Sequence, residues 1–219
     1  MSSGVHPIAN LLAAVARGIT GVQVQWAGCE PDERQRIYFA NHTSHLDFVV
    51  LWSALPPELR ALTRPIAAKD YWEETPLRHY LTANVFRAVL LERGSMAKAK
   101  NPEDAKFVGR HLIEEMASAL GESNSLILFP EGTRGTGEKV GEFRAGLYHL
   151  ALRRPDVELI PAYLENLNRI LPKGEFLPVP MLSLLTFGKP IRVEEGEEKE
   201  AFLERAREAV SSLRRIGSA

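Results

Sequence analysis

Two polar side chains in the first quarter of the chain have the types and the spacing of a general base and its partner. His42 and Asp47 lie in the segment Asn-His-Thr-Ser-His-Leu-Asp, residues 41–47. A carboxylate on one imidazole nitrogen fixes the tautomer and favours the protonated ring, which leaves the other nitrogen free to take a proton. Ser44 is too close in sequence to be favoured as the serine of a Ser-His-Asp triad. The pair therefore predicts general-base chemistry without an obvious nucleophile.

Two other interpretations of this segment stay open. Ser44 and Asp47 have the spacing of a capping box, in which Ser44 starts a helix and Asp47 caps it. His42, His45 and Asp47 also carry metal-ligand side chains, which allows a metal-dependent hydrolase as a further hypothesis. That hypothesis ranks third, because His42 and His45 lack the i, i+4 spacing of a helical ligand pair.

A second polar segment, Pro-Glu-Gly-Thr-Arg-Gly at residues 130–135, directly follows an apolar run. Gly132 lets the backbone approach a ligand closely, and Thr133 adds a hydroxyl. Arg134 suits bidentate recognition of phosphate better than a lysine would. Glu131 can hold Arg134 or accept from a substrate hydroxyl. The segment therefore predicts a phosphate-binding loop.

Two further cations stand at the ends of predicted strands. Lys69 would emerge from a strand over residues 64–69, and Arg93 would end a strand over residues 88–93. A charged residue at a strand exit is usually a solvated residue leaving the core. The sharper hypothesis is that Lys69 faces the same cleft as His42.

Alternating strands and helices must position these residues. Strands are predicted over residues 22–26, 36–40, 64–69, 88–93 and 125–129, and helices over residues 7–19, 48–55, 77–81 and 102–120, with a last helix after the acidic cluster 194–200. His42 thus lies in the loop between a strand and a helix, and such loops of α/β proteins commonly contain catalytic or binding residues.

The first predicted helix has an apolar stripe formed by Ile8, Leu12, Val15 and Ile19. Such stripes usually pack on a core, but a stripe at a chain end can also lie on a membrane surface. We therefore divide the chain into an N-terminal amphipathic helix, residues 1–20, and a main domain, residues 21–219.

The composition suits one soluble globular domain. The chain has 219 residues, of which 45% are hydrophobic and 25% charged, and its net charge is −1. This charge balance gives no electrostatic reason to expect nucleic-acid binding. Cys29 is the only cysteine, which excludes an intrachain disulfide and suits a reducing compartment. No apolar run is long enough to span a bilayer as a helix, and the first residues lack the basic start of a signal peptide.

Together the two polar segments resemble the glycerolipid acyltransferases, the lysophosphatidic acid acyltransferase family in particular. Residues 41–47 match that family's His-x4-Asp block, and residues 129–135 match its phosphate-binding block. Residues 88–93 resemble a block that ends in a substrate-binding arginine, here Arg93, although Arg87 stands where glycine is usual. Weaker likenesses at residues 143–146, 159–162 and 187–191 extend the resemblance over most of the chain.

The resemblance implies a single α/β domain with a mixed sheet flanked by helices. It also implies acyl transfer from acyl-coenzyme A or acyl-carrier protein to a hydroxyl of a lysophospholipid, with 1-acylglycerol-3-phosphate as the first candidate. His42 and Asp47 would be catalytic, and the acceptor phosphate would be positioned by Glu131, Gly132, Thr133, Arg134, Arg93 and Lys69.

The same resemblance implies no bound cofactor or metal, and it implies a cytoplasmic protein placed peripherally on the inner face of a membrane. Two alternatives to a thioester-dependent acyltransferase stay open besides the metal-dependent hydrolase. One is a transacylase that draws its acyl chain from a phospholipid, and the other is a lipid-binding protein without turnover.

Overall fold

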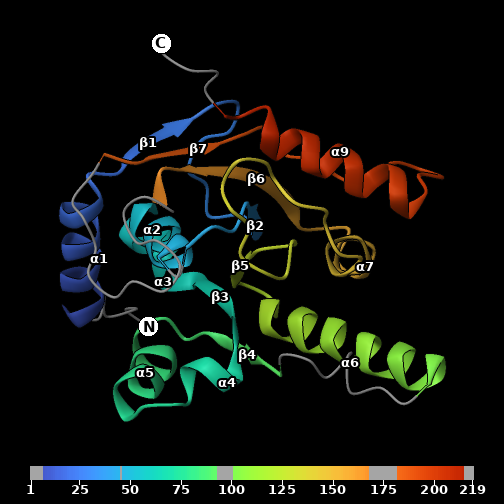
Figure 1. The fold of residues 1–219 in the computed structure, drawn as a ribbon, viewed down its shortest axis with the longest axis horizontal. Coiled ribbons are helices and arrows are strands. Elements are labelled where there is room, and N and C mark those ends of the chain that lie inside the picture. Colours follow the sequence, from blue (N-terminus) through green and yellow to red (C-terminus); the bar gives the residue numbers. More distant parts are fainter. Residues whose placement is uncertain (1–6, 45, 93–100, 168–181, 215–219) are drawn as a thin grey trace.

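The computed structural model describes residues 7–44, 46–92, 101–167 and 182–214 (Figure 1). The described strands form one seven-stranded sheet in the order β1-β7-β6-β2-β5-β3-β4, in which β6 and β7 are antiparallel and every other neighbouring pair is parallel. The strands are β1 Gln23–Trp26, β2 Arg36–Ala40, β3 Thr63–Ala68, β4 Val89–Leu91, β5 Ser125–Leu128, β6 Glu158–Glu165 and β7 Leu184–Phe187. This arrangement confirms the predicted α/β class with a mixed sheet.

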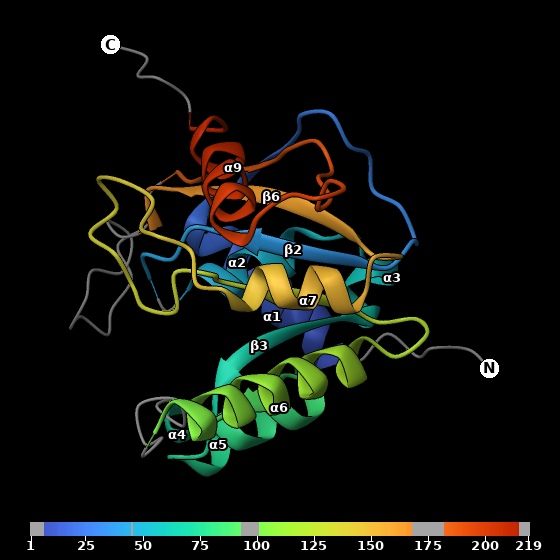
Figure 2. The ribbon, with the colours of Figure 1, turned by 90° about the vertical axis from the view of Figure 1, so that its right-hand side faces the viewer.

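Helices cover both faces of the sheet, as the two ribbon views show (Figures 1 and 2). One face is covered by α1 (Pro7–Thr20), α2 (Asp47–Ala54) and α3 (Pro57–Leu62). The other is covered by α6 (Pro102–Leu120), α7 (Gly146–Arg153) and α9 (Lys199–Ser211). Three short elements connect β3 to β4: α4 (Lys69–Trp72), α5 (Pro76–Tyr80) and the π-helix η1 (Leu81–Val85).

Strand β2 lies inside the sheet and is buried on both faces. Ile37 and Phe39 belong to the core beneath α6, α7 and α9, whereas Tyr38 and Ala40 belong to the core beneath α1 and α2. Parallel strands covered by helices on both sides need apolar residues at every position, which explains the continuous apolar run before His42.

The parallel pairing brings the polar loops to one edge of the sheet. β2 pairs with β5 in the register Phe39 to Leu128, and β3 pairs in parallel with both β5 and β4. The carboxyl ends of these four strands therefore meet at the same edge, where ligands bind in open α/β sheets. The loops that carry His42 and Glu131 follow β2 and β5 and are consequently neighbours.

The predicted capping box forms only in part: the Asp47 carboxylate accepts from the Ser44 N–H, as such a box requires, but the Ser44 hydroxyl accepts from the N–H of Leu46. α2 begins at Asp47, and the residue at its N-cap is Leu46, which makes no side-chain capping bond. Ser44 lies before the helix, and its backbone N–H donates to the Asp47 carboxylate at 2.9 Å. Asp47 binds the chain that precedes the helix because its carboxylate turns back toward His42.

The first helix packs only in part through its predicted stripe, of which Leu12 lies partly buried against the core. Ala9 and Ala13 are buried in the core that includes α2, because their small side chains let the helix approach closely. Ile8, Leu11 and Val15 are instead 37%, 64% and 48% exposed. Bulky apolar residues therefore lie on the outer surface of α1. No helix in the described ranges combines the length and apolar character that crossing a bilayer requires.

Candidate active site

His42 and Asp47 form a hydrogen-bonded pair at the carboxyl edge of the sheet. His42 Nδ1 lies 2.8 Å from Asp47 Oδ2, the Asp47 side chain is fully buried, and the His42 side chain is 17% exposed. The imidazole also stacks on the Phe129 ring, with centroids 4.5 Å apart. The ring is thus held by a carboxylate at its edge and by an aromatic face, while Nε2 makes no hydrogen bond with a described residue.

The surroundings of Asp47 determine which imidazole nitrogen carries the proton. Asp47 Oδ2 also accepts from the backbone N–H of Thr43 at 2.5 Å and of Ser44 at 2.9 Å. With two amides already donating to Oδ2, this oxygen acts as an acceptor, and its contact with His42 is completed as a hydrogen bond when Nδ1 is the donor. Nε2 then carries a lone pair, which a general base needs. Asp47 Oδ1 is buried and has no hydrogen-bond partner among the described residues, so the bonds that this carboxylate makes with them all act on the His42 turn.

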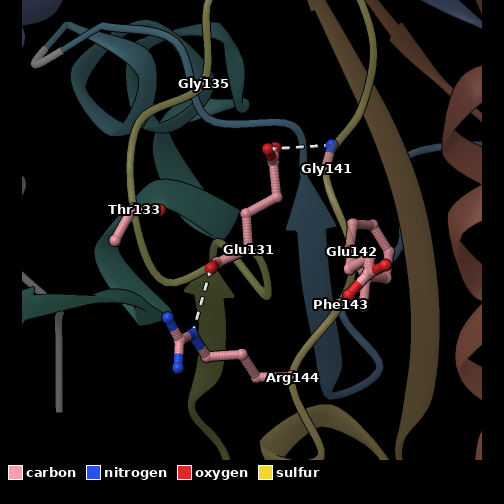
Figure 3. A pocket seen from close by; sticks show the side chains of 7 residues that line it. All are labelled: Glu131, Thr133, Gly135, Gly141, Glu142, Phe143 and Arg144. Atoms are coloured by element: carbon pink, nitrogen blue, oxygen red, sulfur yellow. Dashed lines mark hydrogen bonds between the residues drawn. The ribbon is translucent and has the colours of Figure 1, made fainter.

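Glu131 joins the two polar loops through backbone amides. Its Oε1 accepts from the N–H of His42 at 2.7 Å. Its Oε2 accepts from the N–H of Gly141 at 3.0 Å, a bond that Figure 3 shows. Burial raises the pKa of Glu131, whereas the amides of His42 and Gly141 act in the opposite direction by binding the carboxylate. A side chain on Gly141 would not fit, because its Cβ would lie 2.7 Å from Oε2. Glu131 therefore holds the His42 backbone, and it does not bind Arg134.

We expect Glu131→Gln to destabilise the loop pair. Either orientation of the amide turns its NH₂ group toward the N–H of His42 or of Gly141, so one buried donor is left without an acceptor. The free energy of unfolding should fall by about 1–3 kcal/mol, measured by chemical denaturation, and activity should fall with it. Glu142→Gln is the matched control, since Glu142 is exposed beside the same cavity. Equal stability of the two variants would contradict this role of Glu131.

Asn41 fixes the start of the His42 loop in a way that the sequence analysis missed. Its side-chain amide donates to the Leu164 carbonyl at 2.9 Å, and its side-chain oxygen accepts from the Leu164 N–H at 2.8 Å. These bonds extend the pairing of β2 with β6 by one side chain, so the chain leaves the sheet at a fixed point. In the sequence, this role was indicated by an asparagine placed directly after an apolar strand.

A polar cavity and an apolar groove lie beside this pair. The polar cavity has a volume of about 450 Å³ and is lined by Glu131, Thr133, Gly135, Gly141, Glu142, Phe143 and Arg144 (Figure 3). The groove has a volume of about 300 Å³, and His42 lies in its wall with apolar side chains from β3, β4, α6 and α7, among them Ile66, Leu91, Leu112, Met116 and Leu147. The imidazole therefore faces a space suited to an apolar substrate.

The predicted binding residues fall into different positions. Thr133 lines the polar cavity and Gly132 lines the groove. Arg134 is partly buried, lines neither space and makes no hydrogen bond or ion pair with a described residue. Lys69 is exposed at the start of α4, one residue after the groove residue Ala68. Arg93 lies outside the described residues.

The metal hypothesis has no further support among the described residues. They contain no group of three or more His, Cys, Asp or Glu side chains placed to hold a metal ion. His45, the third ligand of that hypothesis, lies outside the described residues. His42 Nδ1 and Asp47 Oδ2 bond each other, which is the arrangement of a base and its partner.

Comparison with known proteins identifies a family for this chain. The sequence model of the Acyltransferase family matches residues 22–165. The chain is 26% identical to the 1-acyl-sn-glycerol-3-phosphate acyltransferase of Limnanthes douglasii, over 85% of this chain and 60% of the relative. It is 28% identical to the enzyme of that name from Cocos nucifera, over 83% of this chain and 56% of the relative. The chain thus spans somewhat more than half the length of these curated relatives.

A solved structure shares the fold. The crystal structure of the 1-acyl-sn-glycerophosphate acyltransferase PlsC from Thermotoga maritima superposes with a TM-score of 0.68. The superposition covers 94% of this chain and 76% of that one, at 22% sequence identity. The family match includes both polar loops and the five strands from β2 to β6 that position them. The chain therefore belongs to the Acyltransferase family.

Proposed function

We propose that the chain transfers a fatty acyl group from a thioester donor, acyl-coenzyme A or acyl-carrier protein, to a hydroxyl of a lysophospholipid. The preferred acceptor is 1-acylglycerol 3-phosphate and the product is phosphatidic acid. The observation that carries the proposal is the His42 ring, whose Nδ1 is held by Asp47 while the ring lines an apolar groove. The names of the relatives from Limnanthes douglasii and Cocos nucifera support the choice of acceptor.

The reaction needs one base and no covalent enzyme intermediate. His42 Nε2 takes the proton of the acceptor hydroxyl as its oxygen attacks the thioester carbonyl carbon. The carbon–sulfur bond then breaks, and the departing thiolate receives a proton from the imidazolium. Asp47 stays ionised and stabilises the imidazolium between the two proton transfers. The new ester and the free thiol contain all the atoms of the reactants.

The groove is the proposed site of acyl chains. Its walls are mainly apolar side chains, with Glu92 and Arg144 also lining it, and His42 lies among them. A chain bound there would present its carboxyl end to the base. The polar cavity on the other side of Arg144 suits the head group. We assign the acceptor phosphate to Gly132, Thr133 and Arg134, with Lys69 and Arg93 as further cations at the same sheet edge.

The outer surface of α1 is the proposed contact with membrane. Ile8, Leu11 and Val15 are exposed, and helix packing does not need them because Ala9 and Ala13 make the contact with the core. An amphipathic helix with few cations on its polar face binds a bilayer weakly and reversibly. We therefore propose that the chain acts peripherally at the inner face of a membrane, where a lysophospholipid acceptor would reside.

A comparison of acceptors tests the proposal. We expect 1-acylglycerol 3-phosphate to be acylated efficiently and the phosphate-free monoacylglycerol of the same chain length poorly, since a charged hydrogen bond to phosphate contributes about 1.5–3 kcal/mol. Arg134→Lys should reduce the difference in rate between the two acceptors, because a point charge replaces a planar two-donor group. Steady-state assays measure both effects. A parallel assay with the acceptor in phospholipid vesicles tests the contact through α1. Equal rates on the two acceptors would contradict the phosphate site.

A further inference from the structure

Arg144 occupies the boundary between the polar cavity and the apolar groove. It lines both spaces, and among the residues that the structure describes no other does so. It comes two residues before α7, in the segment that returns from the phosphate-binding loop. The sequence analysis gave this arginine no role, because its position depends on the course of that loop.

The structure fixes the Arg144 side chain through backbone contacts. The backbone N–H of Arg144 donates to the Pro130 carbonyl at 2.9 Å, and the side-chain Nε donates to the Glu131 carbonyl at 3.2 Å. The side chain crosses over Gly132, which has φ +72°, and a Cβ at that position would lie 2.5 Å from Arg144 Nε. The absence of a side chain at Gly132 thus leaves the space in which Arg144 lies.

The guanidinium charge has no carboxylate partner among the described residues. Both oxygens of the neighbouring Glu131 are bound to backbone amides. Glu142 also lines the polar cavity, but no ion pair joins it to Arg144, and Figure 3 shows the two side chains extending to different sides of Glu131. With Nε held by a carbonyl, the two terminal nitrogens of Arg144 are left to bind a ligand.

We propose that Arg144 binds a phosphate group of a substrate at this boundary. A guanidinium held through Nε presents two parallel donors, which match two oxygens of a phosphate. The inference rests on the proposed function for the identity of the substrates, since both the acceptor and coenzyme A carry phosphate. The acceptor fits the position better: its hydroxyl must reach His42 in the groove wall, and the boundary beside that wall is where its head group leaves the apolar space.

Binding measurements test this without requiring turnover. The probes are 1-hexanoylglycerol 3-phosphate, 1-hexanoylglycerol and coenzyme A, each titrated into the whole chain by calorimetry. We expect Arg144→Ala to weaken binding of the phosphate-bearing acceptor about tenfold to a hundredfold and to leave the phosphate-free probe unchanged. Arg144→Gln keeps the side chain over Gly132 and should show the same loss, which keeps the test valid if the alanine variant does not fold.

The matched control is Arg192→Ala, which removes an equal charge from an exposed arginine that lines neither space. A loss confined to coenzyme A would assign the bound phosphate to the donor. Unchanged affinity for both phosphate-bearing probes in the Arg144 variants would overturn the inference. If the wild-type chain binds the phosphate-bearing acceptor through Arg144 but transfers no acyl group, the phosphate site stands and the proposed function is rejected. The two failures are therefore distinguishable.

Discussion

Replacing His42 with alanine should lower the rate of acyl transfer by roughly 10²- to 10⁴-fold, the usual contribution of a general base. The variant removes the nitrogen that takes the proton from the acceptor hydroxyl. It should still fold, because Asp47 keeps its bonds to the backbone N–H groups of Thr43 and Ser44. The side chain lies in the groove wall, so its loss leaves the interior of both cores unchanged.

Initial rates of thiol release at saturating donor and acceptor measure the effect, and thermal melting checks the fold. His79→Ala is the matched control, since His79 is an exposed histidine on α5. An activity of the His42 variant close to that of the control would show that another group accepts the proton.

Exchanging Asp47 for asparagine should also lower the rate by roughly 10²- to 10⁴-fold, since it removes the charge that stabilises the imidazolium and disturbs the tautomer. The amide can satisfy His42, Thr43 and Ser44 only by turning its oxygen toward them. That orientation places the NH₂ group where Asp47 Oδ1 is buried without a partner. The opposite orientation turns NH₂ toward the backbone donors, so both orientations leave a buried donor unsatisfied.

The exchange should therefore cost about 1–3 kcal/mol of unfolding free energy as well as activity. Rates are compared at a temperature where both proteins are folded, with Asp70→Asn, an exposed site in α4, as the control. A loss of stability accompanied by normal turnover would make Asp47 a purely structural residue.

The sequence predicted the central part of the fold because its strands are continuous apolar runs and its parallel topology places their ends together. β2 and β5 carry the two polar loops, and their parallel pairing alone makes those loops neighbours. The helix over residues 102–120 was also confirmed, since it has a proline at its start, an apolar stripe and a glycine after its end.

The contacts between loops could not be predicted in the same way. Glu131 was expected to meet Arg134 or a substrate, yet it binds the amides of His42 and Gly141. Backbone amides carry no sequence signal, and the loop between Glu131 and Gly141 has no periodicity to fix its course. The helix over residues 48–55 was predicted to within one residue of α2, but the bond from the Thr43 amide to the Asp47 carboxylate was not, for the same reason.

The packing face of α1 could not be predicted, because its apolar stripe left core packing and membrane contact both open. Ala9 and Ala13 make the close contact instead, and Leu11 stays exposed. Small residues at a helix contact give a weak hydropathy pattern.

The most direct test of the account is a mass spectrum of the products that the purified chain forms from oleoyl-coenzyme A and isotope-labelled 1-acylglycerol 3-phosphate. The account predicts labelled phosphatidic acid and free coenzyme A in equal amounts, with no acyl group left on the protein. Free thiol and fatty acid without the diacyl product would indicate a thioester hydrolase and contradict the account, and so would an acyl-enzyme adduct formed during turnover.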